Sequence, residues 1–129
     1  MTLAYVCILI AALLPYVWAV IAKASGAKYN NSDPRGWLAK QENPRVRRAD
    51  SAQKNSFEAF PAFAASVFMA QLAGVEPQRI GWLALAFVVL RTLYGFFYVG
   101  NNPAMRSMVW FGGFACVFAL MGMAIAQAL

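Results

Sequence analysis

Polar side chains recur at helical spacing in three stretches of an otherwise apolar chain. The first stripe, with steps of three, four and three residues, contains Arg48, Ser51, Asn55 and Glu58. The other two contain Arg91, Tyr94 and Tyr98, and then Arg106, Ser107 and Trp110. Residues three or four apart lie on one face of a helix. Several guanidinium groups around one carboxylate suit an anionic ligand that also has an ammonium group, because arginine binds carboxylates bidentately.

The composition indicates a membrane protein. The chain has 129 residues, of which 61% are apolar and 12% are charged. A soluble domain of this length could not bury so much apolar surface. The sequence has no histidine, and Cys7 and Cys116 have no neighbours at ligand spacing, so we predict no metal site and no disulfide.

Four apolar stretches are candidates for crossing the bilayer, which takes about 20 residues. They cover residues 3–22, 57–73, 80–99 and 105–128. We therefore predict an all-α integral membrane protein in which residues 1–129 form a single domain, a four-transmembrane-helix bundle with up-down topology. With their polar ends included, the helices are expected at residues 2–23, 44–74, 77–99 and 103–128.

The basic residues predict the orientation. Eight of the eleven lysines and arginines lie between Lys23 and Lys54, together with three acids. The positive-inside rule places this first loop in the cytoplasm. Both termini are then outside, and the turn near residue 100 is cytoplasmic. The net charge of +6 thus reflects topology rather than nucleic-acid binding, and the three polar stripes meet in one leaflet.

Capping residues followed by proline mark the expected helix starts. Such pairs occur at Asp33-Pro34, Asn43-Pro44 and Asn102-Pro103, and Pro77 leads a further helix. The first pair predicts a short helix through Lys40. A helix over 44–74 would be about 45 Å long, whereas the hydrocarbon core is about 30 Å thick. Its polar first turns are therefore expected in the cytoplasm.

Small and aromatic residues predict how the helices pack. Four small residues recur every fourth position, which favours close helix contact in membranes: Ala62, Ser66, Ala70 and Gly74. Three tryptophans are expected to anchor the chain at the membrane interface: Trp18, Trp37 and Trp82.

Arg91 has two interpretations. It lies two turns inside the end of the helix over 77–99, roughly 12 Å deep by helical rise. A charge at that depth normally faces a partner or a watery cavity. An ion pair with Glu58 would only set the register of two helices. Alternatively, Arg91 belongs to a ligand site, because further basic and polar side chains gather there: Arg48, Lys54, Asn55, Arg106 and Ser107.

The chain resembles the MAPEG family, the membrane proteins of eicosanoid and glutathione metabolism, and is similar to its bacterial-type members. The segment ADSAQKNSFEAFPAF resembles the family's helix-2 signature, with Asn-x-x-Glu and a following proline. The segment RTLYGFFYVGNNPAMRS resembles the passage from helix 3 to helix 4. The resemblance covers most of residues 44–112, and it implies a homotrimer in which glutathione binds between subunits on the cytoplasmic side.

The resemblance also implies roles for individual residues. Asn55 and Glu58 would hold the glutathione backbone, with Glu58 on its amino group. Arg106 would stabilise the thiolate, and Ser107 matches a serine proposed to activate the thiol in one branch of the family. A guanidinium group raises the reactive thiolate fraction at neutral pH. The remaining implied cofactor-binding residues are Arg48, Lys54, Arg91, Tyr94 and Tyr98.

The implied activity is that of a glutathione-dependent membrane transferase or peroxidase acting on a lipophilic electrophile, in the bacterial inner membrane and among membrane lipids. Two departures bear on it. Several eukaryotic members have an arginine at the position of Ser51, and one synthase has an aromatic residue at the position of Ala59. The alternative is a non-catalytic lipid- or anion-binding scaffold, a role known in one branch of the family. A transporter is disfavoured because the polar residues gather in one leaflet.

Overall fold

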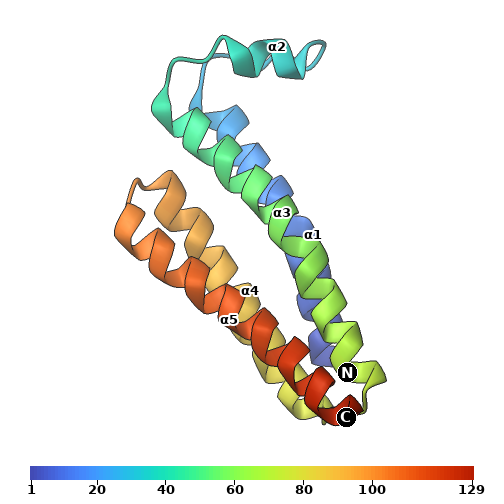
Figure 1. Ribbon diagram of the computed structural model, residues 1–129. Coiled ribbons are helices and arrows are strands. Elements are labelled where there is room, and N and C mark those ends of the chain that lie inside the picture. The colour runs from blue at the N-terminus through green and yellow to red at the C-terminus, as the bar shows by residue number, and fades with distance from the viewer.

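Helices make up most of the computed structural model, which describes all 129 residues (Figure 1). They are α1 (Thr2–Ser25), α2 (Pro34–Ala39), α3 (Pro44–Leu72), α4 (Pro77–Val99) and α5 (Pro103–Ala128). The helix predicted over 44–74 ends two residues earlier than expected. The cause is Gly74, whose φ of +82° takes the backbone into the left-handed region. The amide of Val75 then donates to the carbonyl of Ala70, 3.0 Å away, and closes the helix end.

The predicted caps are present. The side chain of Asp33 accepts from the amide of Gly36, at 3.1 Å. Asn43 and Asn102 likewise cap α3 and α5 through their side-chain oxygens. Each cap satisfies a backbone N–H that has no partner inside its helix.

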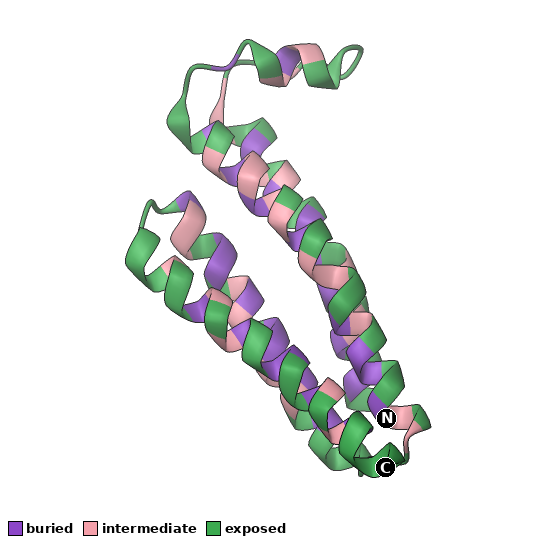
Figure 2. Ribbon diagram, in the orientation of Figure 1, coloured by how far each residue is buried: buried purple, intermediate pink, exposed green.

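The four long helices form two antiparallel pairs. In Figure 1, α1 lies along α3 and α4 lies along α5. The pairs come together at the end that holds both termini and diverge toward α2 and the turn at residues 100–102. Fourteen buried apolar residues from α1, α3, α4, α5 and the α3–α4 turn form the main core, and Figure 2 shows buried residues on the inner faces of the helices. The polar stripes therefore lie where the two pairs separate.

Three helices are long and apolar enough to cross a membrane: α1, α4 and α5. Three of the four predicted spans are thus supported, whereas α3 is not apolar enough over the length of a span. The reason is its first half, where six charged side chains interrupt the sequence: Arg45, Arg47, Arg48, Asp50, Lys54 and Glu58. Its apolar second half still packs against these three helices through buried residues such as Phe63 and Val67.

Two of the expected interface anchors are in fact buried. Trp82 is 60% exposed, but Trp18 is fully buried and Trp37 nearly so. Trp18 fits because Gly95 of α4 has no side chain. A Cβ atom built on Gly95 would lie only 1.9 Å from Cζ2 of the indole. Within the small-residue stripe, Ser66 and Ala70 are fully buried, whereas Ala62 and Gly74 are exposed.

Candidate functional site

The centre of the site is a hydrogen bond between α3 and α4. Nη2 of Arg91 donates to Oδ1 of Asn55 across 2.6 Å. Arg91 is only 3% exposed, so its charge is held inside the protein. Its guanidinium carbon also lies 4.2 Å from the ring centroid of Tyr94, one turn further along α4. The arginine is therefore fixed by an amide oxygen and an aromatic ring.

The Glu58 carboxylate has no cation beside it. The structure contains two ion pairs, Lys54 with Asp50 and Arg79 with Glu76, and neither involves Glu58. Its only hydrogen bond comes from Nδ2 of Asn55, at 3.5 Å. The Arg91–Glu58 ion pair considered from the sequence is therefore not formed. Asn55 stands between the two charges and leaves the exposed carboxylate available to a ligand.

A cavity of about 140 Å³ adjoins these polar groups. It lies between α3, α4 and α5, and its polar wall consists of Asn55, Glu58 and Arg91. The rest of the lining is mainly apolar: Ala59, Ala62, Phe87, Trp110, Gly113, Phe114 and Val117. A pocket of this kind places a few polar groups against an apolar wall, an arrangement typical of sites for amphipathic ligands.

Arg106 extends the site toward the turn at residues 100–102. Its guanidinium carbon lies 4.3 Å from the ring centroid of Tyr98. Tyr98 in turn contacts Tyr94 edge to face, with ring centroids 5.7 Å apart. Contacts thus run continuously from the buried Arg91 through the two tyrosines to Arg106 at the start of α5. Ser107 is exposed, and its side chain makes no hydrogen bond.

Arg48 links α3 to the end of α4. Its Nε donates to the carbonyl of Val99, at 3.1 Å. This bond joins the two helix pairs near their open end and leaves the terminal guanidinium nitrogens without a protein partner. Ser51, one turn further on, is half-buried and forms no side-chain hydrogen bond.

Lys54 lies apart from the other predicted site residues. Its Nζ pairs with Asp50 at 2.8 Å, and it lines a different cavity, next to α1 and α2. Consecutive residues on a helix point about 100° apart, so Lys54 faces away from the stripe that includes Asn55. Within one chain, it is the one predicted residue of α3 that the fold directs elsewhere.

Among the aromatic residues of the cavity, Trp110 was placed on the Arg106 face from the sequence without a role, whereas Phe87 and Phe114 were not predicted as site residues. Phe87 lies four residues before Arg91, and its ring stacks on that of Phe63 at 3.9 Å. Trp110 lies four residues after Arg106 and stacks on Phe114 at 5.0 Å. The spacing of Trp110 from Arg106 was used in the sequence analysis, and the same four-residue spacing of Phe87 from Arg91 was the available signal for Phe87, since residues four apart share a face.

Comparison with known proteins identifies the family. The sequence matches the MAPEG family over residues 3–126, nearly the whole chain. A search of curated proteins found no significant match. The family match covers all four long helices, including the polar stripes on α3, α4 and α5. This chain therefore belongs to the MAPEG family.

Proposed function

We propose that this protein is a glutathione-dependent transferase or peroxidase that acts on lipophilic electrophiles or hydroperoxides. The observation that carries the proposal is the Arg91–Asn55–Glu58 arrangement. The buried Arg91 guanidinium forms no ion pair with a carboxylate, and the Glu58 carboxylate forms none with a cation. Glutathione has carboxylates for guanidinium groups and an ammonium group for a carboxylate. Glu58 would bind its amino group, and Arg48, Arg91 and the two tyrosines would hold the rest.

Arg106 would supply the chemistry. A thiol attacks as its thiolate, and a neighbouring guanidinium stabilises that form. In a transferase reaction the sulfur forms a bond to carbon, and the displaced group or opened ring takes up the proton. In a peroxidase reaction two glutathione molecules become one disulfide, while the hydroperoxide is reduced to an alcohol and water. Ser107, next to Arg106, would donate a hydrogen bond to the sulfur.

A trimer would complete this site. The cavity of about 140 Å³ within one chain is too small to enclose a tripeptide, so neighbouring chains would provide the remaining walls. In this arrangement α3 would be the fourth helix to cross the bilayer, with its charged half in the cytoplasm. Both termini would lie outside, in a bacterial inner membrane, and lipophilic substrates would arrive through the apolar side of the cavity.

Calorimetry on detergent-purified full-length protein tests the proposal. We expect glutathione to bind and to show thiolate absorbance near neutral pH. The variant Glu58→Gln should bind glutathione at least tenfold more weakly, because a hydrogen bond to a charged group contributes about 1.5–3 kcal/mol. Glu76→Gln is the matched control, since Glu76 pairs with Arg79 at the far end of α4.

The results distinguish an enzyme from a scaffold. No binding at millimolar glutathione would overturn the proposal. Equal loss in both variants would show that the effect is not specific to Glu58. The second candidate, a non-catalytic lipid- or anion-binding protein, is favoured by the stacking of Arg106 on Tyr98, because that guanidinium is already engaged within the chain. Binding of glutathione without thiolate formation would support that candidate.

A further inference from the structure

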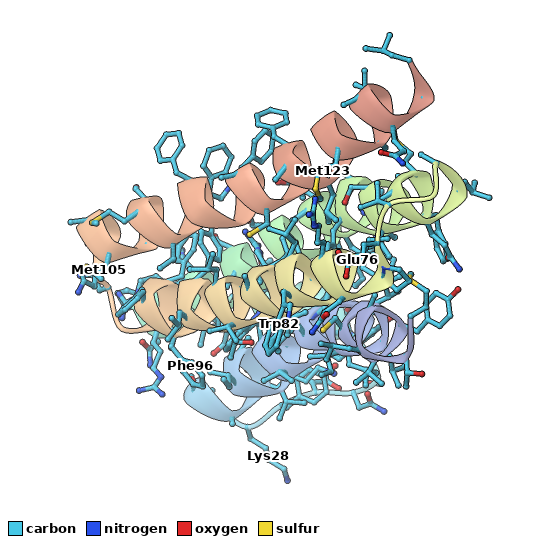
Figure 3. All side chains as sticks on the ribbon, turned by 90° about the horizontal axis from the view of Figure 1, so that it is seen from below. Lys28, Glu76, Trp82, Phe96, Met105 and Met123 are labelled. Carbon is cyan, nitrogen blue, oxygen red and sulfur yellow. The ribbon has the colours of Figure 1, made fainter.

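The apolar part of the cavity beside Arg91 has no role in the glutathione binding proposed above. Its lining residues come from α3, α4 and α5, and none of them belongs to α1. Figure 3 shows α5, which runs from Met105 past Met123, on the side of α4 away from α1. Both α3 and α5 run toward the end that holds the two termini (Figure 1), so they form two walls of the cavity with the same direction.

The cavity is polar at one end and apolar at the other. On α3 its lining begins at Asn55 and Glu58 and ends at Ala62, which lies about 10 Å from Asn55 along the helix axis. On α5 its lining begins at Trp110 and ends at Val117, again about 10 Å away. The cavity is thus about 10 Å long by helical rise, and its apolar end points toward the termini.

The volume of the cavity corresponds to one aromatic ring. It measures about 140 Å³, whereas an engineered apolar cavity that binds benzene has about 150 Å³. At the packing density of protein interiors, about 0.75, it would hold ligand atoms with a volume of about 105 Å³. That is one six-membered ring with a small substituent, and less than two fused rings. A lipid acyl chain, which crosses about 15 Å of hydrocarbon in one leaflet, is longer than the cavity.

Aromatic side chains line the cavity on two helices. On α4, Phe87 is 3% exposed, and its ring is held by the ring of Phe63 at 3.9 Å. On α5, the rings of Trp110 and Phe114 stack on each other at 5.0 Å. A ligand ring in the cavity would therefore meet aromatic edges and faces, the contacts that aromatic rings prefer.

Gly113 keeps space open at the floor of the cavity, where it is buried. A Cβ atom built on it would lie 3.6 Å from Cδ of Arg91 and 3.8 Å from Cδ2 and Cε2 of Phe87, which is ordinary van der Waals contact. An alanine would thus fit against the protein without displacing either side chain. Its methyl group would instead take up room inside the cavity, so the packing of α4 against α5 does not require glycine at this position.

We propose that the apolar part of this cavity binds a single aromatic ring of the lipophilic substrate, and that Gly113 and Phe114 limit the size of that ring. The polar end would then hold the reacting group of the substrate near glutathione, because Asn55, Glu58 and Arg91 line the same cavity. The identity of the ligand as the second substrate rests on the proposed function, whereas binding of the ring is measured without glutathione.

Quenching of tryptophan fluorescence by brominated aryl alcohols tests this proposal on the full-length protein in detergent. The probes are 4-bromobenzyl alcohol, with one ring, and 6-bromo-2-naphthalenemethanol, with two fused rings. We expect saturable quenching by the first probe and at least about tenfold weaker binding of the second. Trp110→Phe should remove the saturable part of the signal, because Trp110 is the tryptophan that lines the cavity.

Two pairs of variants test the limits on ring size. Gly113→Ala should weaken binding of the single-ring probe at least about tenfold, the usual effect of one additional methyl group in an apolar pocket. Gly122→Ala adds the same group to the same helix where nothing lies within 4 Å, and it should retain wild-type affinity. Phe114→Ala should strengthen binding of the two-ring probe about tenfold. Phe118→Ala removes an exposed ring outside the cavity and should leave that affinity unchanged.

Three results would overturn the proposal. Equal affinity of the wild-type protein for the two probes would show that the size of the ring is not limited. Equal weakening in Gly113→Ala and Gly122→Ala, or unchanged quenching in Trp110→Phe, would place the probe outside the cavity. Unfolding temperatures measured without probe show that each variant is folded. Saturable quenching without turnover of single-ring electrophiles or hydroperoxides by glutathione would contradict the proposed function and leave the ring site intact.

Discussion

The contact between Gly95 and Trp18 gives the most direct test of how α1 and α4 pack. A Cβ atom on Gly95 would lie 1.9 Å from Cζ2 of the indole and 2.2 Å from Cε2. Ordinary contact begins at 3.4 Å, so the variant Gly95→Ala would displace the indole by about 1.5 Å. The ring is fully buried and rigid, and it cannot turn away as a flexible side chain could.

The expected cost follows from two opposing terms. Extra atoms in a packed core cost about 1–3 kcal/mol, and we expect the upper end because the clash is with a rigid ring. Alanine is favoured over glycine inside a helix by about 1 kcal/mol. Gly95→Ala should therefore lower the free energy of unfolding by about 2 kcal/mol. Gly122→Ala is the control, since a Cβ there meets nothing within 4 Å, and it should leave stability unchanged or raise it.

Reversible unfolding in mixed micelles, followed by circular dichroism, measures both variants. The indole N–H of Trp18 has no hydrogen-bond partner, so packing alone fixes the ring and Trp18→Phe should relieve the clash. In a double-mutant cycle, Gly95→Ala and Trp18→Phe should couple by more than about 0.5 kcal/mol. If Gly95→Ala proves as stable as Gly122→Ala, the close approach of α1 and α4 at this glycine is wrong.

Two further predictions concern the candidate site. Arg106→Ala should abolish the thiolate absorbance of bound glutathione and leave the oligomeric state intact, whereas Arg79→Ala, at the far end of α4, should change neither; an unchanged thiolate band in Arg106→Ala would refute the role given to that arginine. Asn55→Ala should reduce the free energy of unfolding by about 1.5–3 kcal/mol, because the buried Arg91 guanidinium would lose its acceptor, and Asn55→Asp should restore most of that loss. Wild-type stability of Asn55→Ala in micelles would show that Arg91 has another partner.

Helix starts could be predicted because their causes are local. Asn43 and Asn102 bond to amides two or three residues away, and the prolines that follow them need no such partner. The end of α3 was predicted two residues too late. In the sequence, Gly74 continues the spacing of the small-residue stripe, which favours a helix through this position. Its left-handed backbone, which ends the helix, is seen only in the structure.

The candidate site could be predicted in part, for a different reason. A charge in an apolar helix must face a partner or water, and helical spacing decides which neighbours share its face. This reasoning singled out Asn55, Glu58 and Arg91, which lie around one cavity. It could not decide whether Asn55 or Glu58 is the partner of Arg91, because that depends on the distance between α3 and α4 at these residues.

By itself, the sequence determined where the long helices begin, the apolar character of α1, α4 and α5, and the polar face that each stripe presents. These properties depend on bonds and spacings within a few residues. Only the tertiary structure decided that Asn55 separates Arg91 from Glu58, that Lys54 lines a second groove, and that Trp18 is buried against Gly95. Each of these depends on how one helix is rotated against another, and that rotation is set by the packing of all the helices together.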